Sequence, residues 1–125
     1  GERIRIVVGD IFDVSPEHIG KVMAVYDRAA TVALPASVRP RYAEQVAGLA
    51  GADAKGLLLT ISYEQSEMDG PPFSVPADEV QGLYGGRYSL KCMRSRDVLD
   101  QKPVYQERGL SRLVFEAHLL GCGEA

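Results

Sequence analysis

The sequence contains no tryptophan, only two cysteines and no excess of basic residues. Cys92 and Cys122 have neither a CxxC spacing nor a clustered histidine, which argues against a disulfide scaffold or a structural zinc site. There are 14 Lys and Arg residues against 17 Asp and Glu residues, whereas a nucleic-acid-binding face needs a concentrated basic excess. We therefore expect no metal and no nucleic-acid partner, and reduced thiols are typical of the cytosol.

Long apolar runs are absent as well. No stretch approaches the roughly 20 apolar residues that span a bilayer, and the charged start of the sequence does not resemble a signal peptide. What is present is an ordinary globular composition, with 46% hydrophobic and 25% charged residues in 125 positions. We expect one cytoplasmic domain over residues 1–125, with a core that buries about two-thirds of the unfolded surface.

The first half of the chain alternates strand and helix patterns. Arg3–Val8 has an apolar residue at every second position, as a strand does. A short helix is predicted to begin at Pro16, where a missing N–H costs nothing. The continuous apolar run Val22–Tyr26 is typical of a strand covered on both faces. Apolar spacings of four, four and three predict a helix over Ser37–Ala50, and the uncharged run Leu57–Tyr63 predicts the next strand. This order predicts an α/β protein with a parallel sheet.

The second half begins with a loop over Glu64–Pro76, whose adjacent prolines hold it extended. A loop of this length in a small domain often covers or binds a ligand. A short helix follows over Ala77–Tyr84. Tyr88–Arg94 and Leu113–Leu119 each alternate an apolar with a wetter face, which predicts antiparallel edge strands joined by the irregular link Ser95–Arg112. Cys92 is expected in the core and Cys122 as a near-terminal thiol.

Five short motifs follow one another along the chain: Asp10-Ile11-Phe12, Asp27-Arg28-Ala29-Ala30, Ser62-Tyr63-Glu64, Gly70-Pro71-Pro72-Phe73-Ser74-Val75-Pro76 and Gln106-Glu107-Arg108. Together they resemble the thiopurine S-methyltransferase family, particularly its bacterial members, over essentially the whole chain. The most specific piece is the proline-rich segment followed by its predicted helix. The Asp-Ile-Phe piece is common among α/β proteins and carries little weight alone.

The resemblance implies a Rossmann-like class I methyltransferase sheet with strand order 3-2-1-4-5-7-6 and an antiparallel seventh strand. The sequence looks like strands 3 to 7 only, the C-terminal portion of such an enzyme. It contains no Gly-rich strand-turn-helix of the kind that cradles a cofactor, and no second strand with a ribose-binding acid. Arg3–Val8 would then lack its family neighbour. It would pair beside Val22–Tyr26, pair with another chain, or fray.

By this resemblance, one group of residues borders the methyl donor, S-adenosylmethionine. Asp10 would accept a hydrogen bond from the adenine amine, and Ile11 and Phe12 would cover the ring. The main chain at Asp27 and Arg28 would lie under the methionine part. The alternative interpretation makes Asp10 a turn residue, places Ile11 and Phe12 in the core, and makes Asp27 and Arg28 a surface ion pair of little energetic value.

A second group faces the methyl acceptor by the same resemblance. Arg28 and Arg108 would hold an acidic heteroaromatic ring, since guanidinium groups bind planar anions through paired hydrogen bonds. Pro72 and Phe73 would form a rigid apolar wall. The alternatives are a solvated Arg108, whose neighbour Arg112 is close enough to confuse the match, and a Phe73 that fills the core.

The implied activity is transfer of a methyl group from S-adenosylmethionine to the sulfur of a thiopurine or another aromatic thiol. Tellurium and selenium species are further acceptors that the resemblance permits. No catalytic side chain is required, because a thiolate is already nucleophilic. His18 and His118, the latter on the wetter face of an edge strand, lack partners for metal or acyl-transfer chemistry. The alternative function is a non-catalytic module without the cofactor-binding half, which associates through unpaired strand edges.

Overall fold

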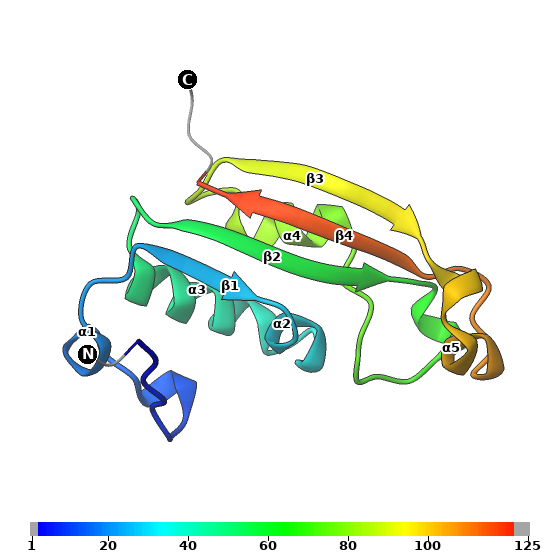
Figure 1. The fold of residues 1–125 in the computed structure, drawn as a ribbon, viewed down its shortest axis with the longest axis horizontal. Helices are drawn as coiled ribbons and strands as arrows, with labels where there is room; N and C mark the ends of the chain where they lie inside the picture. The colour runs from blue at the N-terminus through cyan, green and yellow to red at the C-terminus, as the bar shows by residue number, and fades with distance from the viewer. Residues whose placement is uncertain (1–2, 122–125) are drawn as a thin grey trace.

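The structure, a computed structural model, describes residues 3–121, in which helices pack against a sheet (Figure 1). The strands are β1 (Ala24–Asp27), β2 (Lys55–Ser62), β3 (Leu90–Asp97) and β4 (Val114–Leu120). The helices are α1 (Pro16–Ile19), α2 (Ala30–Ala33), α3 (Arg39–Ala50), α4 (Ala77–Tyr84) and α5 (Pro103–Glu107). The short 3-10 turns are η1 (Ile11–Asp13), η2 (Gln65–Glu67) and η3 (Leu99–Gln101).

The sheet has the strand order β1-β2-β4-β3. β1 and β2 are parallel, whereas β4 is antiparallel to both of its neighbours. The predicted α/β class is confirmed as a four-stranded mixed sheet whose last strand is antiparallel. The prediction that Leu113–Leu119 is an edge strand is wrong, because β4 pairs along its length with β2 on one side and β3 on the other.

β3 does lie at an edge, as its alternating pattern predicted. Lys91, Arg94 and Arg96 are exposed along it, and its pairing with β4 shifts at an irregularity between Cys92 and Arg94. Charges and bulges of this kind discourage an edge from recruiting another chain. The prediction that Cys92 lies in the core is wrong, since this edge strand is exposed from its second residue onward. Cys122 lies outside the described residues.

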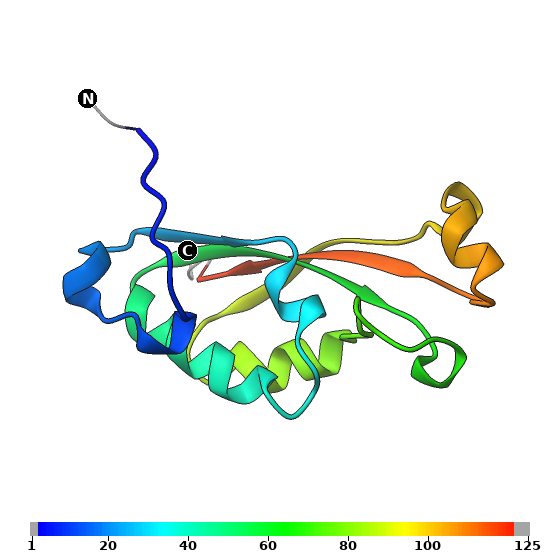
Figure 2. The ribbon, with the colours of Figure 1, turned by 90° about the horizontal axis from the view of Figure 1, so that it is seen from below.

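The prediction that Val22–Tyr26 is covered on both faces is also wrong. β1 is the opposite edge of the sheet, and Met23 and Tyr26 are 76% and 63% exposed. Figure 2 shows the reason: α3 and α4 lie on the same side of the sheet. No helix within residues 3–121 therefore covers β1 on the face that carries Tyr26 and its paired neighbour Leu57.

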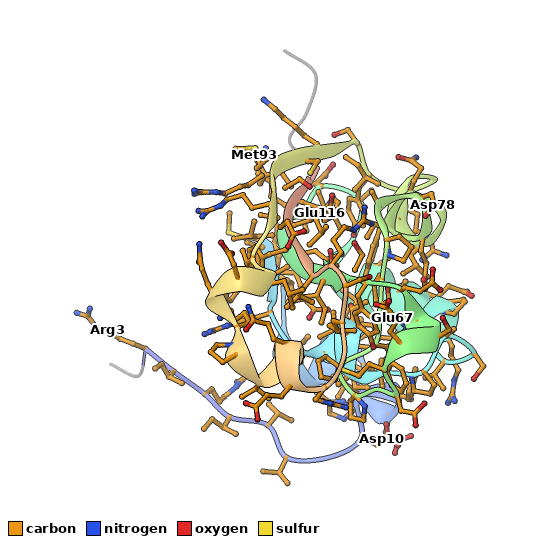
Figure 3. All side chains as sticks on the ribbon, turned by 90° about the vertical axis from the view of Figure 1, so that its right-hand side faces the viewer. Arg3, Asp10, Glu67, Asp78, Met93 and Glu116 are labelled. Atoms are coloured by element: carbon orange, nitrogen blue, oxygen red, sulfur yellow. The ribbon has the colours of Figure 1, made fainter. Side chains whose placement is uncertain are left out.

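Residues 3–8 form no strand, so the prediction for Arg3–Val8 is wrong. Ile4, Ile6 and Val8 are 81%, 83% and 93% exposed, and Figure 3 shows the segment at Arg3 projecting away from the rest of the molecule. A strand needs a neighbour for its backbone N–H and C=O groups. The four strands of the described sheet all find partners elsewhere, and pairing of this segment with another chain stays a prediction.

The main core lies between the sheet and the helices α3 and α4. Its buried members are Ala43, Ala47, Leu58, Val75, Val80, Tyr84, Tyr88 and Leu120. A second, smaller cluster closes the end of the sheet where β2 ends: Tyr63, Met68, Leu110 and Leu113, with Tyr105 of α5 against it. The link predicted as irregular thus contains η3 and α5, which lie on the opposite side of the sheet from α3 and α4 (Figure 2).

Two helical glycines are expected to weaken the fold. Gly48 in α3 and Gly82 in α4 are exposed, and a Cβ built on either meets nothing within 4 Å. Gly48→Ala and Gly82→Ala should each raise the free energy of unfolding by about 0.5–1 kcal/mol, because alanine loses less backbone entropy. The control is Gly51→Ala, equally free of contacts but at φ +83°, which should destabilise. Denaturant titration measures all three, and equal effects would contradict the helix-propensity argument.

Candidate functional site

The acceptor residues predicted from the sequence follow three different elements at one end of the sheet. Arg28 follows β1, Pro72 and Phe73 lie in the loop after β2, and Arg108 follows α5. Because β1 and β2 are parallel, their carboxyl ends meet at the same edge, the edge at which open α/β sheets bind ligands. In Figure 1 α2, the loop after β2 and α5 all lie toward this end.

Asp27 ends β1 with its side chain 7% exposed. Its Oδ1 accepts hydrogen bonds from the backbone N–H groups of Ala30 and Thr31 at 3.0 and 3.3 Å. Its Oδ2 accepts from the Thr31 hydroxyl at 2.6 Å and from the Tyr42 hydroxyl at 3.1 Å. Burial, and then the charge of Asp27, raise the pKa of Tyr42, which keeps that hydroxyl a donor. The carboxylate therefore organises the turn into α2, and only the main chain of Asp27 is left for a ligand.

Arg28, the next residue, differs from Asp27 in both burial and hydrogen bonding. Its side chain is exposed, and it makes no hydrogen bond or ion pair with any residue in the range 3–121. The alternative of an ion pair between Asp27 and Arg28 is not observed, because the Asp27 carboxylate is turned inward. An arginine without a partner beside a buried, fully bonded aspartate leaves a guanidinium group available at the carboxyl end of β1.

The loop after β2 is held in place by hydrogen bonds. The Tyr63 hydroxyl donates to the Pro72 carbonyl at 2.7 Å, and the Phe73 N–H donates to the Val32 carbonyl at 2.7 Å. The half-buried Phe73 ring lies on Gly70, where an added Cβ would clash with the ring. Only glycine leaves room for that ring, so the segment is a compact apolar corner tied to α2.

Arg108 contacts the same loop. Its Nη2 donates to the Asp69 carbonyl at 3.0 Å. The two loops meet a second time where Glu67 Oε1 accepts from the backbone N–H and the hydroxyl of Ser111 at 2.9 and 3.0 Å, and that N–H lowers the pKa of Glu67. Arg112 is the other arginine that could match the family position. It is exposed and makes no hydrogen bond to the part of the chain that the structure describes. Of the two arginines, Arg108 is the one that bonds to the loop after β2.

The predicted donor turn lies on α3. Asp10 Oδ1 accepts from the Phe12 N–H at 2.9 Å, and Gln45 Nε2 donates to the Ile11 carbonyl at 2.8 Å. The guanidinium of Arg41 lies 3.9 Å from the centre of the Phe12 ring. Ile11 is 38% exposed, so it is not the core residue of the alternative interpretation, whereas the turn role of Asp10 in that interpretation is observed. Figure 3 shows Asp10 at the margin of the molecule.

Two buried polar side chains escaped the sequence analysis. Arg39 is 2% exposed and is described below. His118 was predicted on a wetter face but is 3% exposed, because β4 is internal and its helix-side residues are covered. His118 Nε2 lies 3.4 Å from Thr60 Oγ1 and 3.4 Å from Glu116 Oε1. The signal that could have found it is the period of two that His118 shares with the buried Leu120.

Between residues 3 and 121, no three His, Cys, Asp or Glu side chains cluster as a metal site would require. Over the same range, no helix is both long enough and apolar enough to cross a bilayer. The site consists of exposed guanidinium groups, an aromatic corner and main-chain groups, a set suited to binding and orienting a planar ligand.

The sequence matches the model of one protein family and several curated proteins. The family model described as thiopurine S-methyltransferase (TPMT) matches residues 1–120. The thiopurine S-methyltransferase of Bordetella petrii is 50% identical over 110 residues, covering 88% of this chain and 50% of that protein. That of Methylococcus capsulatus is 44% identical over 117 residues, covering 94% and 53%, and that of Bordetella pertussis is 43% identical over 121 residues, covering 94% and 55%. The chain spans about half the length of these curated relatives.

Proposed function

This chain belongs to the thiopurine S-methyltransferase family, and on that premise we propose that it supplies the acceptor-binding part of a methyltransferase. The reaction would move a methyl group from S-adenosylmethionine to the sulfur of a thiopurine or another aromatic thiol. The observation that supports the proposal is that Arg28 follows β1 at the carboxyl end of the parallel pair, and that Arg108 bonds to Asp69 in the loop after β2, which also carries Phe73. Guanidinium groups around an aromatic corner suit a planar, acidic ring.

We assign β1, β2, β3 and β4 to strands 4, 5, 6 and 7 of the class I methyltransferase sheet. The order β1-β2-β4-β3, with β4 antiparallel, supports this assignment, because it corresponds to the order 4-5-7-6 with strand 7 antiparallel. The assignment puts Arg28 and the loop after β2 at the ligand-binding edge of the sheet.

The residues at the predicted donor positions fit part of S-adenosylmethionine. Ile11 is 38% exposed and offers an apolar surface to an adenine ring. Asp10 uses Oδ1 for the Phe12 N–H, while its Oδ2 has no partner among the described residues and can accept from an exocyclic amine. The main chain at Asp27 and Arg28 is the proposed support for the methionine part. When bound, the donor supplies an electrophilic methyl group on a sulfonium.

This chain's own contribution would be binding and orientation. Arg28 and Arg108 would hold the anionic edge of the acceptor, and Pro72 and Phe73 would pack against its face and exclude water. The Asp27 carboxylate already accepts four hydrogen bonds, so it is not available as a general base. None is needed when the acceptor thiol ionises near neutral pH, since the thiolate is the nucleophile.

A chimera tests the proposal. In it, this chain replaces the matching residues of the Bordetella petrii relative, and methylation of a thiopurine is followed with S-adenosylmethionine as the donor. We expect turnover comparable with that of the relative. The 125-residue chain alone is the control, and we expect it to bind the donor far more weakly, because it has no Gly-rich cofactor turn. A chimera that folds and binds the donor but does not methylate would contradict the proposal.

A second candidate function is an interaction module. It is favoured by the open edge of β1 and by the exposed Ile4, Ile6 and Val8, which together offer a strand and a place to pair it. An inactive chimera, together with concentration-dependent association of the 125-residue chain in sedimentation experiments, would favour this function over the enzyme.

A further inference from the structure

Arg39 is a buried cation outside the residues assigned to the reaction. It lies at the start of α3 and is 2% exposed. Its Nε donates to the Leu34 carbonyl at 2.9 Å, and its Nη1 donates to both carboxylate oxygens of Glu79 at 2.9 and 2.8 Å. Its Cζ lies over the Phe73 ring, 5.7 Å from the ring centre, within the range of a cation–π contact.

These contacts join three parts of the chain at one point. Leu34 follows α2, Glu79 lies in the first turn of α4, and Phe73 belongs to the loop after β2. The backbone of Phe73 donates to Val32 of α2, and among residues 3–121 the cation over its ring is Arg39. The guanidinium N–H groups thus bond to Leu34 and Glu79, while its Cζ lies over the Phe73 ring.

Stability by itself does not call for an arginine here. Removing a charge from water is costly, and a buried ion pair can often be replaced by apolar residues without loss. What an arginine adds is geometry, because one rigid plane bonds along its edge and stacks through its face at the same time. A lysine in this position would keep a positive charge beside Glu79 but would offer no plane to Phe73.

We propose that Arg39 is a positioning residue, which holds the Phe73 ring as the wall of the acceptor site through the guanidinium face while its edge is anchored on Leu34 and Glu79. The role in acceptor binding rests on the proposed function. The role of Arg39 in placing the Phe73 ring does not depend on the proposed function. The two roles are tested separately.

Fluorine NMR of the 125-residue chain, labelled with 4-fluorophenylalanine, tests the placement of the ring. The chain has three phenylalanines, and Phe12 serves as an internal reference because the Arg41 guanidinium lies over its ring, at the shorter distance of 3.9 Å. Arg39→Lys should move the Phe73 resonance toward that of a solvent-exposed ring and leave Phe12 in place. The matched variant Arg41→Lys should do the reverse. An unmoved Phe73 resonance in folded Arg39→Lys would overturn the proposal.

Kinetics of the chimera test the consequence for the acceptor. Arg39→Lys should raise KM for the thiopurine by about twofold to thirtyfold, the effect of losing one partly desolvated cation–π contact. KM for S-adenosylmethionine should stay the same. The exposed Arg87, whose Nη2 is 3.8 Å from Glu44, provides the control Arg87→Lys, which should change neither constant.

A double-mutant cycle distinguishes positioning from general destabilisation. In a Phe73→Leu background, Arg39→Lys should no longer affect the acceptor KM, because the ring that it places is gone. An undiminished effect in that background, or equal losses for donor and acceptor, would overturn the proposal. Glu79→Gln keeps an acceptor for Arg39 and covers the case in which Arg39→Lys fails to fold, with a smaller change in the same direction expected. If the wild-type chimera is inactive, the proposed function fails while the fluorine measurement still decides the role of Arg39.

Discussion

Replacing Asp27 with alanine is expected to lower the free energy of unfolding by about 3–5 kcal/mol, enough to unfold a large fraction of a marginally stable domain. The carboxylate is 7% exposed and accepts four hydrogen bonds from Ala30, Thr31 and Tyr42. Alanine would leave the hydroxyls of Thr31 and Tyr42 buried without their acceptor, and each such group costs about 1–3 kcal/mol.

Two further variants test whether this loss of stability comes from the Asp27 carboxylate. Asp27→Asn keeps one acceptor oxygen in a side chain of the same shape, so we expect it to lose less stability than Asp27→Ala. Arg28→Ala is the matched control, because Arg28 is adjacent in sequence, exposed and without a partner in the described chain, and should change stability by less than about 0.5 kcal/mol. Urea titration followed by circular dichroism measures all three. If Asp27→Ala proves as stable as Arg28→Ala, the carboxylate does not organise the turn as described.

Arg28→Ala and Arg108→Ala should each raise KM for an acidic thiopurine by about tenfold to a hundredfold in the chimera. The loss of one charge-assisted hydrogen bond costs about 1.5–3 kcal/mol, which corresponds to that range in affinity. KM for S-adenosylmethionine should be nearly unchanged. Arg108 also donates to the Asp69 carbonyl, so its removal takes away one hydrogen bond to the loop after β2 in addition to a charge.

The chain offers a close control for this pair. Arg112→Ala removes another exposed arginine, one that makes no hydrogen bond to the described part of the loop after β2, and it should leave both constants unchanged. A neutral aromatic thiol provides a second comparison, because its binding does not depend on charge. Equal losses with acidic and neutral acceptors, or a loss expressed mainly in the KM for the donor, would show that the arginines serve another role. For Arg28, a rise mainly in the KM for the donor would also report a shift of its main chain, which is proposed to border the donor.

Elements whose signals lie within a few residues were predicted closely from the sequence. The helix predicted over Ala77–Tyr84 has the same bounds in α4, because Pro76 can precede a helix and Gly85 ends it. The helix predicted over Ser37–Ala50 is α3, which begins two residues later and ends at Ala50, just before Gly51, where φ is +83°. The short helix after Ser15 likewise forms, with the Ser15 N–H bonded to His18 Nδ1 at 2.9 Å. Capping and periodicity are local properties, so a sequence window contains them.

The same local patterns misplaced strands within the sheet. An alternating pattern identifies a strand but does not say whether one neighbour or two will pair with it. Leu113–Leu119 was therefore predicted as an edge and is internal, while the continuous apolar run Val22–Tyr26 was predicted to be covered on both faces and is an exposed edge. Arg3–Val8 has the pattern of a strand and no partner within the described sheet, so it forms none. Pairing depends on groups far away along the chain, which a period of two does not record.

The residues of the candidate site were likewise predicted in part from the sequence and decided in part by the tertiary structure. The residue types and motifs of the sequence determined the family and the arginines and aromatic corner expected at the acceptor, because these are carried by short segments such as Gly70–Pro76. Only the tertiary structure decided that Asp27 is buried in its own turn, that Arg108 rather than Arg112 reaches the loop at Asp69, and that Arg39 lies against Phe73. Those contacts join residues 15, 39 and 34 positions apart, and such pairs come together only when the sheet and its helices pack.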